Sequence, residues 1–232
     1  MTALKKFEKL ALLPQTGHIT APTEWVPYRP LTGYRKVRRL AMLGLDQPDT
    51  IVIHATAGGS TDGAMSVMRA GKASWHYIIP DENEPEHGHH ALQCVPLDSA
   101  AWHVLSSVKH PTDGKKNIND RSFGIELVNR QDGNDRFSAW QVLVTAEIVT
   151  ELRSWYPIKY LFTHAYLDPR RKLDPGNIFP WDTFMEHINR LASIGDSTPI
   201  KIIRHGTDDI IAEYDMEPNG NHLADQGKLY VA

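Results

Sequence analysis

Two histidines and one aspartate of this chain have the types and spacing of ligands for a single metal ion. His54 and His164 each follow a short apolar run that predicts a buried strand, so both side chains are expected at a sheet edge. Asp174 lies ten residues after His164 and precedes Pro175-Gly176, a turn sequence that restricts its orientation. Two imidazoles and a carboxylate leave a fourth tetrahedral position for water, which is the composition of a catalytic zinc site. Zinc would lower the pKa of that water toward about 7.

The histidine and cysteine content limits the metal chemistry that is open to the chain. Its 232 residues include twelve histidines, 28 acidic side chains and one cysteine, Cys94. A single cysteine excludes an internal disulfide and a zinc finger, because both need further thiolates. Any metal must therefore be bound by imidazole and carboxylate. Twelve histidines and 28 carboxylates also offer many such triples, so composition and spacing alone leave a chance arrangement open.

The charge balance and hydropathy exclude several classes of partner. The 25 Lys+Arg residues are balanced by 28 Asp+Glu residues, and this argues against a protein that binds nucleic acid by neutralising phosphates. No apolar run reaches the roughly 18 residues that a membrane span needs. Charged residues interrupt the first thirteen positions, unlike the apolar core of a signal peptide. We therefore expect a cytoplasmic protein that does not insert into membranes; the oligomeric state stays open.

Short apolar runs alternate with helical patterns along most of the chain. Ser138 and Gln141 form a capping-box pattern at the start of one helix, and Pro157 ends it. These elements predict an α/β (α+β) fold with a central mixed β-sheet, helices on its faces and one zinc cleft. The strands are expected near 51–54, 75–79, 90–97, 123–128 and 160–162, and the helices near 61–70, 138–155 and 181–191.

Three regions follow from these elements. Residues 1–44 contain many prolines and predict an irregular N-terminal segment that packs on a main domain over residues 45–194. Residues 195–232 predict a small β-rich C-terminal extension with strands near 200–204, 209–214 and 229–231. Since such a short piece cannot form a core of its own, it must pack on the main domain, on a partner, or across a dimer.

Five segments, in this order, resemble the type-2 N-acetylmuramoyl-L-alanine amidase family. That family includes amidase-type phage lysozymes, cytoplasmic muropeptide amidases and peptidoglycan recognition proteins. The resemblance covers roughly residues 45–192, which would make 45–194 a zinc amidase domain. The segments are residues 51–57 (IVIHATA), 75–79 (WHYII), 101–103 (AWH), 122–129 (SFGIELVN) and 163–181, which contains THA, RKLDPG and FPW.

The resemblance implies a role for each matching residue. It assigns His54, His164 and Asp174 as ligands of Zn²⁺, in agreement with the chemical interpretation above. It assigns Glu126 as the general acid/base and Lys172 as the group that stabilises the oxyanion. Three further residues are expected to bind substrate, although His103 has the alternative of a hydrogen bond within the fold: His103, Trp102 and Thr56.

The resemblance also implies a reaction. The family hydrolyses the amide between the lactyl group of N-acetylmuramic acid and the L-alanine of the stem peptide, so the partner would be peptidoglycan or a muropeptide. The alternative is a non-catalytic peptidoglycan-recognition module, and the presence of Glu126 and Lys172 favours the enzyme. Ala55 and the segment 166–170 depart from the family pattern and leave the substrate's form open. A phage endolysin, released to the wall through a separate pore, is as compatible with the sequence as a cytoplasmic enzyme.

Overall fold

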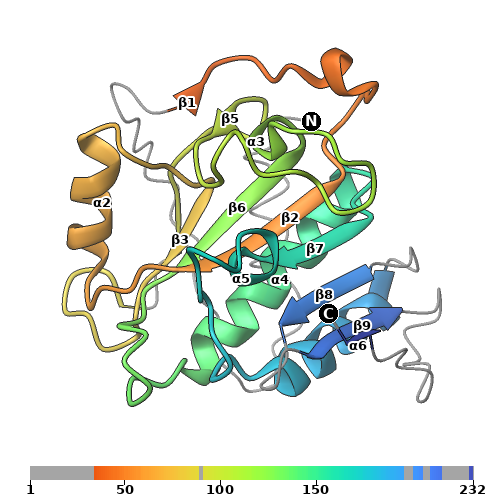
Figure 1. Cartoon of the computed structure of the whole chain (residues 1–232). Helices are drawn as coiled ribbons and strands as arrows, with labels where there is room; N and C mark the ends of the chain where they lie inside the picture. The colour runs from red at the N-terminus through yellow and green to blue at the C-terminus, as the bar shows by residue number, and fades with distance from the viewer. Residues whose placement is uncertain (1–33, 89–90, 196–200, 206–209, 216–229, 232) are drawn as a thin grey trace.

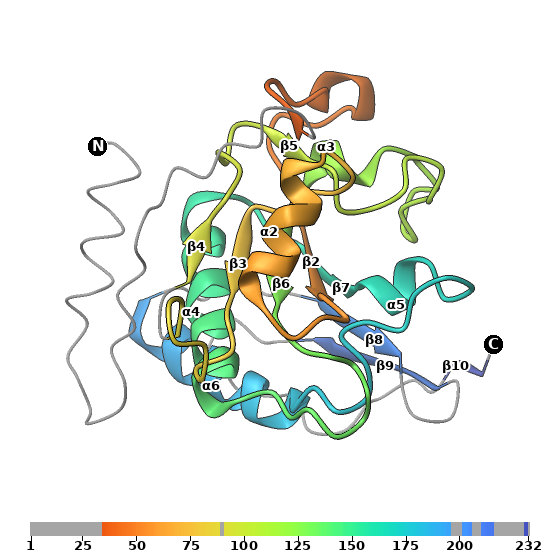
Figure 2. The same ribbon diagram turned by 90° about the vertical axis from the view of Figure 1, so that its left-hand side faces the viewer.

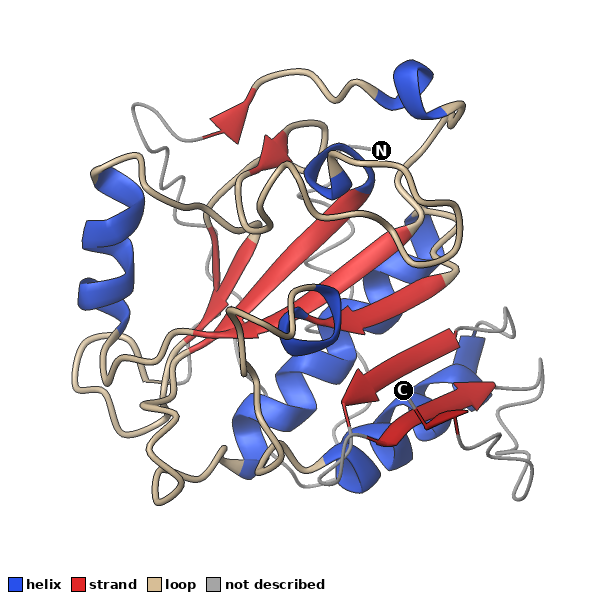
Figure 3. Cartoon of the chain, in the orientation of Figure 1, coloured by secondary structure: helices blue, strands red, loops and turns tan. Residues whose placement is uncertain are grey.

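A mixed β-sheet forms the centre of the molecule, as Figures 1 and 3 show. The computed structural model describes residues 34–88, 91–195, 201–205, 210–215 and 230–231. Within them the sheet has the strand order β10-β9-β8-β7-β2-β6-β3-β4. The prediction of a central mixed sheet flanked by helices is confirmed. Its strands are β2 (Thr50–Ala55), β3 (Tyr77–Ile79), β4 (Leu92–Gln93), β6 (Ser122–Leu127), β7 (Tyr160–Thr163), β8 (Lys201–His205), β9 (Ile210–Asp215) and β10 (Tyr230–Val231).

The middle of the sheet is parallel. Strand β2 pairs with β6 on one side and with β7 on the other, in parallel, and the register sets His54 opposite Glu126 and Ile53 opposite Thr163. Strands β3 and β8 extend this parallel core, whereas β4, β9 and β10 are antiparallel to their neighbours. The carboxyl ends of β2, β6 and β7 therefore meet at one edge, where open α/β sheets bind ligands.

Two long helices cover one face of this sheet, as Figure 2 shows. Helix α4 (Ala139–Trp155) begins with the expected capping box, in which Ser138 and Gln141 satisfy each other's backbone N–H groups. Helix α6 (Trp181–Gly195) packs beside α4. Buried apolar side chains from both helices, including Trp140 and Phe184, form the main core with the strands.

The alternation of side chains along each strand decides which residues reach the opposite face. Ile51 and Ile53 of β2 belong to the core under α4 and α6. Val52 packs in a separate cluster, so His54, two residues further on, lies on the face away from those helices. Glu126 of β6 shares that face with His54, because paired residues on adjacent strands point the same way.

Short elements not predicted from the sequence surround the parallel core. The expected helix near 61–70 is α2, which Ser60 caps, but two expected strands are shorter than predicted: β3 lacks residues 75–76, and β4 covers only Leu92–Gln93. The predicted helix α2 spans Thr61–Arg69. The elements that were not predicted are η1 (Leu40–Leu43), α3 (Ile118–Arg121), α5 (His164–Leu167) and the antiparallel pair β1 (Tyr34–Arg35) and β5 (Ala100–Ala101). The pairing of β1 with β5 could not be predicted from the sequence, because a strand of two residues is too short to show an alternation of polar and apolar side chains.

The regions on either side of the main domain join it in different ways. The C-terminal strands continue the central sheet, because β8 pairs in parallel with β7. Before β2, the Arg38 guanidinium is buried and donates hydrogen bonds to the carbonyl oxygens of Leu97 (3.0 Å) and Ser122 (2.9 Å). Arg35 forms an ion pair of 2.5 Å with Asp120. The remainder of the predicted N-terminal segment, residues 1–33, lies outside the described residues. None of the described helices is long and apolar enough to span a bilayer.

Candidate metal centre and active-site cleft

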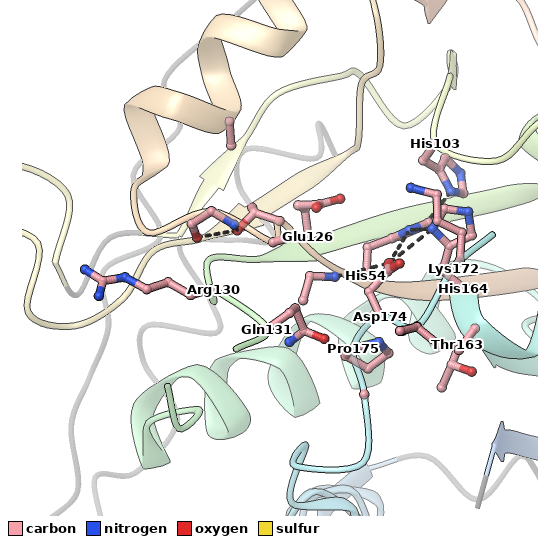
Figure 4. A pocket seen from close by; sticks show the side chains of 18 of the residues that line it. His54, His103, Glu126, Arg130, Gln131, Thr163, His164, Lys172, Asp174 and Pro175 are labelled. Atoms are coloured by element: carbon pink, nitrogen blue, oxygen red, sulfur yellow. Dashed lines mark hydrogen bonds and ion pairs between the residues drawn. The ribbon is translucent and has the colours of Figure 1, made fainter. Parts of the chain in front are cut away.

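A cavity of about 1050 Å³ opens at the carboxyl ends of β2, β6 and β7. Figure 4 shows that its labelled residues come from strands and from the segments that follow them. The segment after β7 closes one side of the cavity, and the loop after β6 lies on another. All five residues predicted for metal binding and catalysis line it: His54, Glu126, His164, Lys172 and Asp174.

Three of these side chains converge on one point. His54 Nδ1 lies 2.9 Å from His164 Nδ1 and 3.4 Å from Asp174 Oδ2, and His164 Nδ1 lies 3.1 Å from the same carboxylate oxygen. Zinc bonds of about 2.0–2.1 Å in a tetrahedral arrangement place two ligand atoms roughly 3.3–3.4 Å apart. The three buried groups therefore match, in donor type and spacing, a site for one ion with two imidazole ligands and one carboxylate.

The charges of these three groups depend strongly on one another. Burial, and then the neighbouring His164, lowers the pKa of His54 to about 4, so this imidazole is neutral at physiological pH. Burial acts to raise the pKa of Asp174, but the neighbouring imidazoles of His164 and His54 hold it well below its usual value. A neutral imidazole and an ionised carboxylate are the forms of these side chains that bind a divalent cation.

Local backbone interactions hold His164 and Asp174, the two candidate ligands that follow β7. The Thr163 side chain caps α5 by accepting a hydrogen bond from Tyr166 N, so His164 is the first residue of that short helix. Ala165 N donates to the backbone oxygen of Asp174 at 2.9 Å, which ties the two segments together. Gly176, with φ of 80°, supplies the left-handed turn expected after Asp174.

Glu126 faces the cavity beside the three converging groups. Its carboxyl group makes no hydrogen bond or ion pair with the described residues, although it is only 8% exposed. Burial, and then the charge of Asp174, raises its pKa well above the usual value, while Lys172 opposes this shift. A buried carboxyl group without a partner, whose pKa is raised, has the properties of a general acid/base.

Basic side chains occupy the rim of the same cavity. Lys172 lines the cavity and is half-buried, and its backbone N–H donates a hydrogen bond to Asp168 O. Arg130 and Arg171 also line the cavity, and both are exposed. Arg130 lies over Gly59, where a Cβ atom would come within 2.7 Å of its Nε atom. Sequence analysis missed Arg130, although its place just after a predicted strand pointed to this edge of the sheet.

The three residues predicted to bind substrate differ in their surroundings. Thr56 lines the cavity, but its hydroxyl bridges the backbones of Gly58 and Asn129. His103 also lines the cavity, and it is buried and hydrogen-bonded to His54 and Ser122, so both interpretations of this residue stay open. The Trp102 side chain is 42% exposed and lies outside the described cavity lining. Their role in substrate binding stays a prediction, since two of the polar groups already have partners within the fold.

Comparison with known families agrees with this arrangement. Residues 44–177 match the Amidase_2 family, described as N-acetylmuramoyl-L-alanine amidase. This chain belongs to the Amidase_2 family. The match contains each of the five predicted catalytic and metal-binding residues, and the resemblance inferred from the sequence is confirmed.

Curated relatives of this Amidase_2 chain are amidases by name. It is 31% identical over 160 residues to N-acetylmuramoyl-L-alanine amidase AmiD of Escherichia coli (strain K12), covering 64% of this chain and 56% of that protein. It is 35% identical over 117 residues to 1,6-anhydro-N-acetylmuramyl-L-alanine amidase AmpD of the same strain, covering 49% and 57%. The chain thus spans little more than half the length of these curated relatives.

Solved structures share the fold of this Amidase_2 chain. A crystal structure of an AmpD derivative superposes with a TM-score of 0.53 and 23% identity, covering 76% of this chain and 99% of that one. AmpDh3 from Pseudomonas aeruginosa gives a TM-score of 0.51 and 23% identity, covering 75% and 65%. These similarities support the architecture, including the parallel core that carries the cavity.

Proposed function

We propose that this protein is a zinc-dependent N-acetylmuramoyl-L-alanine amidase. It would hydrolyse the amide that joins the lactyl group of N-acetylmuramic acid to the L-alanine of the stem peptide, in peptidoglycan or in muropeptides. The observation that carries the proposal is the convergence of His54, His164 and Asp174 beside a buried, unpartnered Glu126 in one cleft. Membership of the Amidase_2 family supports the same reaction.

An amide is a weak electrophile with a poor leaving group. Its hydrolysis therefore needs an activated water, a group that transfers protons and a group that stabilises the oxyanion. Zinc held by two imidazoles and a carboxylate supplies water of lowered pKa and polarisation of a carbonyl group. Glu126 takes a proton from the attacking water and donates it to the alanine nitrogen as the C–N bond breaks. The Lys172 ammonium stabilises the negative charge that develops on the carbonyl oxygen.

The burial of Glu126 suits both halves of this proton transfer. A carboxyl group of normal acidity would be a weak base and would remain ionised when the amine must be protonated. Since burial raises the pKa of Glu126, the group is a stronger base than an exposed carboxylate and can also return the proton as an acid. Arg130 and Arg171 at the rim give the cleft a positive edge that fits an acidic stem peptide.

The proposal can be tested with purified protein and two substrates. Zinc-loaded protein is incubated with a soluble muramoyl peptide and, separately, with intact peptidoglycan, and new N-terminal L-alanine is measured. We expect release that stops after chelation and returns with added zinc. The matched control is Glu126→Gln, which keeps the shape of the site. Binding of the peptide without release of any alanine amine would refute the amidase and favour the recognition module.

A further inference from the structure

We propose that His103 is a positioning residue that fixes the orientation and tautomer of His54. This inference rests on the metal site proposed above and adds a chain of groups behind it. The chain runs from His54 through His103 to Ser122 and ends at the backbone oxygen of Ile118. It assigns His103 a role in metal binding in place of the predicted contact with substrate.

The direction of each hydrogen bond in this series follows from the tautomer of His54. His54 Nδ1 faces the other two ligand atoms and must present a lone pair to a metal, so its hydrogen is on Nε2. That Nε2 lies 2.9 Å from His103 Nδ1, which therefore accepts. The hydrogen of His103 is then on Nε2, which donates to Ser122 Oγ at 3.1 Å.

The hydrogen bonds of Ser122 agree with this assignment. Ser122 Oγ accepts from His103 and uses its own hydrogen to donate to Ile118 O at 2.8 Å. His103 and Ser122 thus each donate once and accept once, with His54 as the first donor and Ile118 O as the last acceptor. If these hydrogen bonds ran in the opposite direction, the hydrogen of His54 would be on Nδ1, where it would block the bond to a metal. The arrangement therefore selects the tautomer that can bind a metal.

Two further features show that the position of His103 is built into the fold. Its ring lies over Gly124 in the middle of β6, where a Cβ atom would come within 2.7 Å of His103 Cγ. Its backbone is held by Asn119, whose Oδ1 accepts from His103 N (3.3 Å) and Val104 N (2.9 Å). Ser122, Gly124 and Glu126 occupy alternate positions of one strand, so β6 supports the ligand and supplies the proposed acid/base from the same face.

The first test measures zinc affinity by competition with a chromophoric chelator, using zinc alone and no substrate. His103→Leu removes the acceptor for His54 Nε2, and we expect zinc to bind about 10–100-fold more weakly. His103→Asn offers a carbonyl oxygen near the position of Nδ1 and should restore part of this loss. Gly124→Ala removes no polar group but displaces the ring, so it should also weaken zinc binding.

The matched control is His110→Leu. His110 is another fully buried histidine whose two nitrogens both have hydroxyl partners, Thr50 and Thr112, but it lies at the other end of β2. This substitution should lower the melting temperature and leave zinc affinity within about twofold of wild type. Melting temperatures of all variants then separate a loss of folding from a loss of positioning.

A second readout concerns the tautomer itself. Long-range ¹H–¹⁵N spectra of the zinc-loaded protein should show His54 protonated on Nε2, with a slowly exchanging hydrogen that exchanges quickly in His103→Leu. Equal zinc affinity of wild type and His103→Leu, or a His54 hydrogen on Nδ1, would overturn this inference alone. Failure of the wild-type protein to bind zinc would overturn it together with the proposed metal site.

Discussion

Both ends of β2 have buried histidine and carboxyl groups, and a basic side chain, near them. At the amino end the carboxylates are paired with a cation, whereas at the carboxyl end they are not. At the amino end, Asp49 and Arg121 form a buried ion pair through two hydrogen bonds, and Arg121 also donates to Asp113 at 2.6 Å. Thr50 donates to Asp49 at 2.8 Å and lies 3.1 Å from His110 Nε2. Both carboxylates of this cluster, which we call the amino-end network, are paired with the Arg121 guanidinium.

At the carboxyl end, by contrast, the groups converge without neutralising one another. Two imidazole nitrogens and a carboxylate oxygen point at a common centre, and Glu126 beside them has no partner among the described residues. A buried acceptor without a donor costs free energy that the amino-end network does not incur. Residue type alone therefore does not distinguish structure from function here. What distinguishes them is whether the fold itself satisfies the buried groups.

The largest effect on the carboxyl end of β2 is expected from Asp174→Asn. We expect zinc affinity to fall by more than the roughly 100-fold that loss of a supporting partner costs, because a direct ligand and its charge are removed. Amidase activity should disappear with the metal, while the fold remains, since the amide occupies the same volume. Chelator competition and thermal unfolding test both statements, and tight zinc binding by the variant would exclude Asp174 as a ligand.

Glu126→Gln should separate the acid/base from the metal site. Loss of proton transfer is expected to lower kcat by about 10²–10⁴-fold, because the amide can neither take nor return the proton. Bound zinc should remain at one equivalent, measured by atomic absorption. If the metal were lost together with turnover, Glu126 would be a ligand and not the acid/base.

The basic residues at the two ends, Arg121 and Lys172, are expected to differ in their contribution to stability. Arg121→Met leaves Asp49 buried without its cation, and the free energy of unfolding should fall by about 3–5 kcal/mol. Urea denaturation monitors this loss, and zinc affinity should stay near that of wild type. A loss of zinc binding in folded Arg121→Met would show that the two ends are coupled.

Lys172→Met is the corresponding change at the cleft, where the basic group has no ion pair among the described residues. The free energy of unfolding should change little, but kcat should fall by about 10²–10³-fold if the ammonium stabilises the oxyanion. Steady-state kinetics on a soluble muramoyl peptide measure this effect. A rise in KM with unchanged kcat would assign Lys172 to substrate binding instead.

Sequence patterns predicted the cleft better than the amino-end network, for a physical reason. His54, Glu126 and His164 lie at the ends of apolar strands, and parallel strands bring those ends together. The partnership of Asp49 with Arg121 depends on the register between β2 and β6, across 72 residues of chain. The role of His103 was left open because its hydrogen bonds to His54 and Ser122 join residues 49 and 19 positions away, although the spacing of Ser122 and Gly124 before Glu126 placed all three on one face.

The smallest expected effect concerns the pH dependence of stability and again contrasts the two ends. Burial, and then Arg121, lowers the pKa of His110 from 6.5 to about 4. Between these values the unfolded chain binds a proton that the folded protein does not, so the stability contributed by neutral His110 is present above pH 6.5 and is lost as the pH falls toward 4. In zinc-free protein, His110→Gln should therefore lose about 2–3 kcal/mol less than wild type between about pH 7 and pH 4.5. Urea denaturation at both pH values, with chelator present, measures the difference. Equal losses would mean that acid acts mainly through the cleft, where His54 has a similarly lowered pKa.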